Sequence, residues 1–194
     1  MAKNFVGYMK QYMATEREVY DKLPLTDINA VMNVLEETRL AGGRVFVCGN
    51  GGSAATAAHF VCDFDKGVSH KLGHAEGERY DFICLNDNVP TMMAIANDMS
   101  YDDVFVLPLM NKMRSGDAVM GISGSGNSEN VVRALKYANE HGGVSIALTA
   151  YDGGRMKKIA QHNIHIPINN MQIAEDLHMI IDHMMMWVLN QEKM

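Results

Sequence analysis

Two turns that combine glycines with hydroxyl side chains have the clearest chemical character in this chain. The first spans residues 48–53 (CGNGGS) and the second spans residues 123–128 (SGSGNS), and each follows an apolar run and precedes a helical segment. Glycine lets the backbone approach a ligand closely, and a helix start offers unpaired N–H groups and the positive end of the helix dipole. Hydroxyl and amide donors without lysine or arginine can form a neutral cradle for a phosphate group. The two turns therefore predict a site for a phosphate or a polyol.

Each turn also has a purely structural interpretation, in which Ser53 or Ser128 caps the helix that follows. A cap needs one serine, whereas the second turn contains Ser123, Ser125 and Ser128, so we favour the phosphate cradle. The glycine spacing matches neither the GxGxxG turn of dinucleotide-binding folds nor the GxxxxGK[ST] P-loop. We therefore expect no nucleotide cofactor.

Two helical segments carry groups that can move protons or bind a cation. His59 and Asp63 are four residues apart after the first turn, so they share one face of a helix. The last helical segment adds Glu175, His178, Asp182 and His183. Carboxylates and imidazoles suit general acid–base catalysis, and they also suit a divalent cation, zinc first where two histidines are present. For His178, beside Met179 on an apolar helix, we favour a core or interface position.

Short apolar runs alternate with helical segments after the first forty residues. The runs that predict strands are 44–48, 82–85, 118–122, 144–148 and 164–166. The segments that predict helices between and after them are 54–64, 89–97, 102–113, 130–141, 154–161 and 173–189. Before them, residues 1–41 show helical periodicity, with Thr26 as the expected cap of the second helix. The polar segment 65–81 is expected to be a loop, with His70 and His74 in solvent.

This alternation predicts an α/β fold with a mostly parallel, doubly wound sheet of five strands between two layers of helices. We expect a single domain over 1–194, with N-terminal helices at 1–41 and the sheet core and last helix at 42–194. Ligands of such sheets bind beyond the carboxyl ends of the strands, near the point where the strand order reverses. Both turns leave strands at that edge, so one ligand could touch both.

The composition excludes several classes of protein. The net charge is −6 and no long basic run is present, so we expect no nucleic-acid partner. No apolar run approaches the roughly 20 residues of a membrane span. Cys48, Cys62 and Cys84 have no CxxC spacing, which indicates buried thiols in a reducing compartment. We expect a cytoplasmic protein.

The motifs, in their order along the chain, resemble the sugar isomerase (SIS) family, whose fold is flavodoxin-like. They are GNGGSAA at 49–55 followed by His59, AND at 96–98, GISGSGNS at 121–128 and LTAYDGG at 148–154. The likeness runs over residues 42–188 and is greatest to the phosphoheptose isomerases. It implies an intramolecular oxidoreductase, an aldose–ketose isomerase that interconverts sedoheptulose 7-phosphate and a D-glycero-heptose 7-phosphate through an enediol, for heptose-containing glycans or nucleotide-heptoses.

The resemblance also implies roles for individual residues. Asp63 becomes the candidate base and His183 the candidate acid, and one zinc ion per subunit would be held by His59, Asp63, Glu175 and His183. The implied substrate contacts are Asn50, Gly51, Gly52, Ser53, Asp63, Asn97, Asp98, Ser123, Gly124, Ser125, Ser128 and Glu175. The family further implies a homotetramer with active sites at subunit contacts. Methionines gather in the helical segments, which suits either a subunit interface or an intrachain core.

Two positions depart from the family pattern. Asp63 replaces the usual Glu and reaches about 1.5 Å less far, by bond-length arithmetic. Glu175 replaces a Gln and adds a negative charge, which a cation would tolerate and which an empty site would feel as repulsion. On one continuous helix Glu175 and His183 lie about 12 Å apart. They can share an ion only if the helix starts after Glu175 or if one of them comes from a neighbouring subunit.

Other functions remain open at this point. One alternative is an isomerase of another phosphosugar with the same cradle. Another is a non-catalytic SIS protein that senses a sugar phosphate or binds a protein, such as the relatives that associate with the replication initiator DnaA. The presence of His59, a carboxylate at position 63 and His183 favours catalysis. The lack of a DNA-binding segment in the sequence disfavours a transcription regulator.

Overall fold

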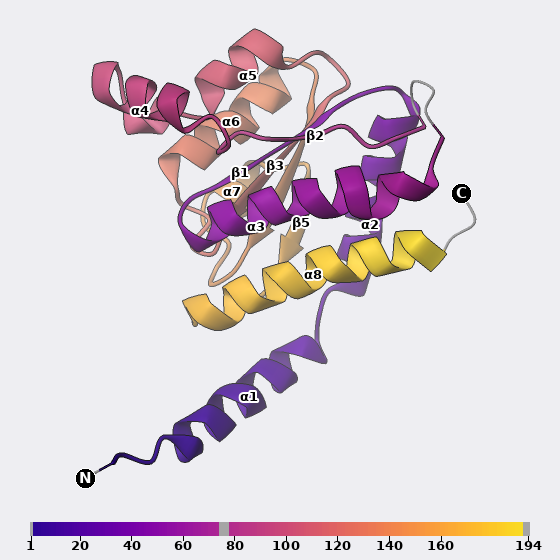
Figure 1. The fold of residues 1–194 in the computed structure, drawn as a ribbon. Helices are drawn as coiled ribbons and strands as arrows, with labels where there is room; N and C mark the ends of the chain where they lie inside the picture. Colours follow the sequence, from indigo (N-terminus) through magenta and orange to yellow (C-terminus); the bar gives the residue numbers. More distant parts are fainter. Residues whose placement is uncertain (1, 74–77, 192–194) are drawn as a thin grey trace.

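A parallel sheet forms the centre of the computed structural model, which describes residues 2–73 and 78–191 (Figure 1). The strands are β1 (Val45–Gly49), β2 (Phe82–Cys84), β3 (Ala118–Ser123), β4 (Val144–Thr149) and β5 (His162–His165). Their order across the sheet is β2-β1-β3-β4-β5, and every neighbouring pair is parallel. The predicted five-stranded, doubly wound α/β fold is confirmed.

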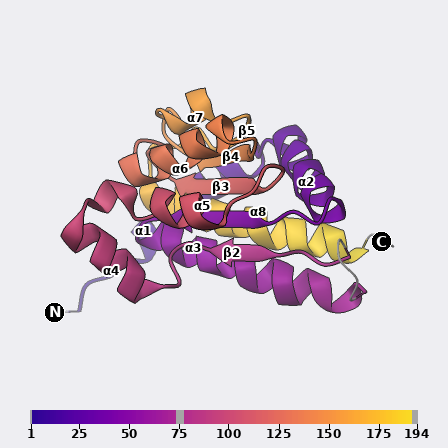
Figure 2. The ribbon, with the colours of Figure 1, turned by 90° about the horizontal axis from the view of Figure 1, so that it is seen from above.

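Helices cover both faces of this sheet. One face packs against α2 (Leu25–Leu40), α3 (Gly52–Val61) and α8 (Met171–Gln191), and the other packs against α5 (Val106–Lys112), α6 (Glu129–Glu140) and α7 (Met156–Ile159) (Figure 2). Along β1, Val45 and Val47 enter the first core cluster, whereas Phe46 and Cys48 enter the second. Burial on both faces explains why the central strands β1 and β3 are continuous apolar runs. The edge strand β5 instead contains His162, Asn163 and His165, which are only partly buried.

The strand order reverses between β1 and β3, the two strands that lead into the glycine- and hydroxyl-rich turns. Gly49 at the end of β1 is level with Ile122 in β3. Because both strands run in the same direction, both turns emerge at the same edge of the sheet and beside each other. The fold thus brings together two segments that are more than seventy residues apart in the chain.

Two helices keep much of their apolar surface outside the core. Helix α1 (Val6–Tyr20) has no buried residue and extends away from the sheet in Figure 1. Helix α4 (Val89–Asp98) also has no buried residue, although most of its side chains are apolar. No helix among the residues that the structure describes is both long and apolar enough to cross a membrane.

Several local predictions differ from the structure. Thr26 does not cap α2, because the helix already starts at Leu25, with Pro24 in the capping position and no side-chain cap. The segment after α3 is not a loop at its start: it continues as a π-helix (Cys62–Val68) and a 3₁₀ turn (Ser69–Lys71). Phe64 and Val68 cause this continuation, because they are fully buried in the core between the sheet and α8. His70 is exposed, as expected, and His74 lies outside the described residues.

Other differences concern element ends and one cysteine. The predicted helix over 102–113 divides into a 3₁₀ turn (Tyr101–Asp103) and α5. Helix α8 begins at Met171, two residues earlier than predicted, and Glu175 lies within it, as the predicted bounds imply. Cys48 and Cys84 are buried free thiols, but Cys62 is exposed. Its helix buries the neighbouring positions Phe60 and Phe64 instead.

Candidate functional site

The first turn joins β1 to α3 through a glycine in a left-handed conformation. Gly51 occupies the capping position of α3 with φ of 55°, and no side chain caps this helix. Ser53 therefore does not act as the cap. The side-chain amide of Asn86, after β2, holds the start of the turn: its Oδ1 accepts from the N–H of Gly49 at 3.3 Å, and its Nδ2 donates to the carbonyl of Gly49 at 2.9 Å.

Gly52, the first residue of α3, is in close contact with Glu175 of α8. A Cβ atom at position 52 would lie 2.5 Å from the carboxylate atoms of Glu175. Only glycine leaves room for this carboxylate beside the start of α3. A negative charge is favourable there, because it faces the positive end of the helix dipole.

The second turn brings three hydroxyl groups together. The Oγ atom of Ser123 lies 3.1 Å from Oγ of Ser128 and 3.5 Å from Oγ of Ser125. Ser128 is at the capping position of α6, yet its side chain makes no capping hydrogen bond. The purely structural interpretation of Ser128 is therefore wrong, and its hydroxyl belongs to the serine cluster.

The loop after β4 braces the second turn from outside. The N–H of Ala150 donates to the carbonyl of Gly124 at 2.8 Å, and the N–H of Met156 donates to the carbonyl of Gly126 at 2.9 Å. The guanidinium of Arg155 donates to the carbonyl of Asn127 at 2.8 Å. These contacts hold the backbone of the turn, to which Oγ of Ser125 adds one hydrogen bond by accepting from the N–H of Asn127 at 3.3 Å.

A pair of asparagines ties the two turns to each other. Asn50 and Asn130 exchange two side-chain hydrogen bonds, each 2.9 Å long, and the Tyr101 hydroxyl donates to Oδ1 of Asn50 at 2.8 Å. Asn130 is almost completely buried in the first turn of α6. Sequence reasoning missed Asn130, Tyr101 and Asn86, since no local pattern marks a side chain whose partner lies on another element.

The two turns line a single hollow of about 290 Å³. Its walls are Asn50, Gly51, Gly52, Ser53, Ile122, Ser123, Gly124, Ser125, Ser128, Met171 and Glu175. No lysine or arginine is among these residues. The hollow can therefore offer hydroxyl and amide donors from two strand ends to one small polar ligand.

A cluster of two imidazoles and one carboxylate lies further along α3 and α8. Nε2 of His59 is 3.0 Å from Nε2 of His183, and Oδ2 of Asp63 is 3.6 Å from the first nitrogen and 3.9 Å from the second. Oδ2 of Asp63 is buried and has no hydrogen-bond partner among the described residues. These ligand-type atoms lie within 4.8 Å of one another and could hold a metal ion. Two imidazole nitrogens and a carboxylate oxygen suit zinc.

Comparison with known proteins agrees with this architecture. The profile of the SIS domain family matches residues 7–150. The chain belongs to the SIS domain family. It is 35% identical over 158 residues to a phosphoheptose isomerase from Aliarcobacter butzleri, a match that covers 80% of each chain. It is 32% identical to a probable phosphoheptose isomerase from Thermoplasma acidophilum, over 94% of this chain and 98% of that protein.

A solved structure supports the same assignment for this SIS domain. The phosphoheptose isomerase GmhA from Neisseria gonorrhoeae superimposes with a TM-score of 0.87 at 26% sequence identity. The match covers 97% of this chain and 100% of that one. Nearly the whole chain therefore follows the architecture of that protein.

Glu175 is separated from the imidazole cluster within one SIS domain. Helix α8 is continuous from Met171 to Gln191, so eight residues place Glu175 and His183 about 12 Å apart along its axis. Glu175 lies in the hollow of the turns, and the group of His59, Asp63 and His183 does not contain it. Glu175 as a ligand of the same ion stays a prediction that requires a neighbouring subunit.

The remaining candidates of the SIS domain lie in two different environments. Asn97 and Asp98 are exposed at the end of α4, where the Asn97 amide donates to the Asp98 carboxylate at 2.7 Å, and neither lines the hollow. His178 and Asp182 are fully buried on α8. Burial lowers the pKa of His178 to about 4, and burial together with the charge of Asp63 raises the pKa of Asp182 to about 8. His178 is thus a neutral core histidine, as predicted.

Proposed function

We propose that this SIS domain is an aldose–ketose isomerase that interconverts sedoheptulose 7-phosphate and a D-glycero-heptose 7-phosphate through an enediol. The observation that carries the proposal is the single hollow lined by two serine- and glycine-rich strand ends. A sugar phosphate has the polar, anionic character that such a neutral cradle recognises. The seven-carbon sugar is proposed because relatives over most of the chain are phosphoheptose isomerases.

Substrate binding is assigned to the two turns. The phosphate group would accept hydrogen bonds from the hydroxyls of Ser123, Ser125 and Ser128 and from N–H groups at the start of α6. Asn50, Ser53 and Glu175 would face the sugar hydroxyls, with Gly51, Gly52 and Gly124 leaving space for close backbone approach. Asn97 and Asp98, outside the hollow of one chain, would reach the sugar only if α4 moves or a neighbouring subunit is present.

Proton transfer is assigned to the cluster on α3 and α8. Asp63 would remove the proton from one of the two reacting carbons and return it to the other, and His183 would exchange protons with the oxygens. The buried Oδ2 of Asp63 supports this role, since no group within residues 2–73 and 78–191 donates a hydrogen bond to it. His59 would orient His183 through their contact of 3.0 Å.

One zinc ion per subunit is proposed at His59, Asp63 and His183, with Glu175 of a neighbouring subunit as a further ligand. The donor set fits, because two imidazole nitrogens and an unsatisfied carboxylate oxygen lie close together. When bound, zinc would polarise the substrate oxygens as a Lewis acid. Metal analysis and activity after chelation and zinc return would test this part separately.

A homotetramer in the cytoplasm is proposed as the working form. The exposed apolar side chains of α1 support association, since Tyr8 is 75% and Met9 is 61% exposed. Contiguous apolar surface of this kind marks protein contacts. Association would also bring groups from different chains into one active centre.

The decisive experiment offers the purified protein a panel of ketose 7-, 6- and 5-phosphates, with and without zinc. We expect conversion of sedoheptulose 7-phosphate to the aldose and exchange of its C1 hydrogen label with solvent. Conversion of a different ketose phosphate alone would replace the proposed substrate. Conversion of none, in metal-loaded and metal-free protein alike, would refute the isomerase.

A further inference from the structure

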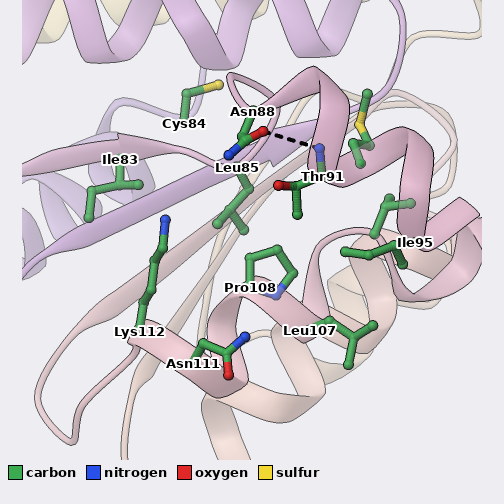
Figure 3. A pocket seen from close by; sticks show the side chains of 12 residues that line it. Ile83, Cys84, Leu85, Asn88, Thr91, Ile95, Leu107, Pro108, Asn111 and Lys112 are labelled. Carbon is green, nitrogen blue, oxygen red and sulfur yellow. Dashed lines mark hydrogen bonds between the residues drawn. The ribbon is translucent and has the colours of Figure 1, made fainter.

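A second hollow lies on the other side of the sheet, between β2, α4 and α5 (Figure 3). Its volume is about 360 Å³, larger than the hollow of the two turns. Apolar side chains form most of its wall, including Ile83, Leu85, Met92, Ile95, Leu107 and Pro108. A concave, mainly apolar space of this size with a few polar groups is typical of a small-molecule site.

The charge in the lining of this hollow is positive and comes from a lysine. Of the described residues that line the hollow, Lys112 is the only charged one, and none is an aspartate or a glutamate. Among the described residues its ammonium group forms no ion pair, while Thr91 and Asn111 add polar side chains. Cys84 contributes no charge near neutral pH, because burial raises the pKa of its thiol to about 11. The hollow is therefore complementary to an apolar body with one negative group.

Helix α4 rests partly on this space and partly on the second core cluster. It has no buried residue, and Figure 3 shows Thr91 and Ile95 of α4 facing Leu107 and Pro108 of α5 across the hollow. A ligand between them would add apolar contacts to those that Met92, Ile95 and Ala96 already make with the second core cluster. The position of α4 would then depend on the ligand.

The hollow borders groups of the proposed active centre. Leu85 precedes Asn86, whose amide holds both backbone groups of Gly49. Helix α4 ends with Asn97 and Asp98, two of the candidate substrate contacts. A shift of the end of β2 would thus reach the first turn through the hydrogen bonds between Asn86 and Gly49, and a shift of α4 would move Asn97 and Asp98 relative to the hollow of the turns.

We propose that this hollow binds a small amphipathic anion, with its apolar chain between α4 and α5 and its acidic group at Lys112, and that binding changes the affinity for the sugar phosphate. The binding step is independent of the proposed function, and only the change in sugar-phosphate affinity rests on it. The two can therefore fail separately.

Decanoate is a suitable probe, compared with decanol and decyltrimethylammonium in calorimetric titrations of the full chain. We expect saturable 1:1 binding of decanoate, weaker binding of decanol and none of the cation. Lys112→Met should weaken decanoate binding about two- to fivefold, the range expected for one exposed ion pair, whereas Lys136→Met on α6 should not. Equal binding of decanol and decanoate would overturn the role of Lys112.

A filling variant tests the location. Leu107→Trp places a larger side chain in the hollow and should abolish decanoate binding, whereas Met110→Trp, on the exposed side of the same helix, should leave it unchanged. Binding that persists in Leu107→Trp, or a changed subunit number in that variant, would overturn the proposal, the latter because it would make the hollow a contact between copies.

Coupling is tested by the affinity for sedoheptulose 7-phosphate at saturating decanoate, measured by calorimetry so that turnover is not required. We expect a change of at least threefold in the wild type, none in Leu107→Trp, and the same factor when decanoate is titrated into the sugar-phosphate complex. An unchanged affinity would overturn the coupling. Failure of the protein to bind any sugar phosphate would instead count against the proposed function, and the decanoate titrations would still decide the site.

Discussion

The side chain of Asp63 lies in a setting that favours a reactive or metal-binding role. Its side chain is 13% exposed, and its Oδ2 faces Nε2 atoms of His59 and His183 without a hydrogen bond. An unsatisfied buried carboxylate oxygen costs free energy unless a proton, a cation or a ligand compensates it. The shorter aspartate at this position reaches both imidazoles without a contact closer than 3.6 Å, which leaves room for such a partner.

Replacement of the acid–base residues should reduce the rate and not the fold. We expect Asp63→Asn and His183→Ala each to lower kcat by about 10²-fold or more, the usual contribution of a positioned acid or base. His141→Ala, an exposed histidine at the end of α6, is the matched control. Unchanged kcat in both active-centre variants would remove the assignment, and metal content measured on the same samples would separate lost chemistry from lost zinc.

The serines of the second turn should act on binding. Ser123→Ala and Ser125→Ala each remove one hydroxyl donor to an anion, and we expect KM for the sugar phosphate to rise about tenfold or more, in line with hydrogen bonds to charged groups. The value of kcat should change little, because the phosphate is held equally in the ground and transition states. Ser115→Ala, on the opposite edge of the sheet, serves as control. A lower kcat at unchanged KM would contradict this role.

Helix α8 joins three environments within one element. Glu175 lies at the hollow of the turns, His178 and Asp182 lie in the core, and His183 is exposed at the imidazole cluster. Burial of His178 lowers the stability of the fold at acid pH, and burial of Asp182 lowers it as the pH rises. The neutral His178 opposes protonation, since burial lowers its pKa from 6.5 to about 4, and Asp182 opposes ionisation, since its pKa rises from 3.8 to about 8.

These shifts predict a specific pH dependence for the metal-free protein. Between about pH 4 and 6.5 the unfolded state holds the His178 proton and the native state holds the Asp182 proton. The two states then bind equal numbers of protons at these groups, so their contributions to the pH dependence of stability cancel. Between about 6.5 and 8 only native Asp182 is protonated, so stability falls as pH rises, by about 2 kcal/mol at 1.36 kcal/mol per unit.

Chemical unfolding in the presence of a chelator would measure this dependence. Asp182→Asn cannot ionise at this position. We therefore expect its free energy of unfolding to fall by about 2 kcal/mol less than that of the wild type between pH 6.5 and 8. Asp27→Asn, at an exposed position in the first turn of α2, should keep the wild-type slope. Parallel pH profiles of wild type and Asp182→Asn would show that the buried carboxyl does not titrate in this range.

The molecule as a whole leaves apolar surface on α1 and at the end of α8 exposed to solvent in the single chain. Helix α1 has no buried residue, and Trp187 near the end of α8 is 63% exposed. The separation of Glu175 from His183 points to the same need, because the proposed ligand set cannot close within one chain. Association between copies would cover the exposed apolar side chains of α1 and α8, and it would bring Glu175 of one copy to the imidazole cluster of another.

Subunit mixing tests whether the active centre is shared. Asp63→Asn inactivates the cluster, and Ser125→Asp places a negative charge in the phosphate hollow, so each variant alone should be inactive. If one subunit supplies the hollow and its neighbour supplies the cluster, a 1:1 mixture should regain roughly a quarter of wild-type activity by random pairing in a symmetric oligomer. Native mass spectrometry would verify the exchange. Mixed assemblies without activity would place the whole active centre in one chain.

Much of the architecture follows from local pattern. The run at residues 118–122 is buried on both faces in β3, and its continuous apolar character identifies it because a strand covered on both faces of a parallel sheet is apolar throughout. The turns at Gly51 and Ser123 were identifiable because left-handed backbone and clustered hydroxyls leave a compositional signal. Parallel strands that end at one edge then bring the turns together.

Contacts between distant elements could not be predicted in this way. The helical continuation at Phe64 and Val68 depends on burial against α8, and the bridge between Asn50 and Asn130 depends on two loops that meet only in the folded chain. Likewise, only the packing of α3 on α8 decided that Glu175 contacts Gly52 while His183 joins Asp63. The sequence determines which groups are present and how they repeat along each element. The tertiary structure determines which of them meet, because helix packing depends on side chains from many parts of the chain at once.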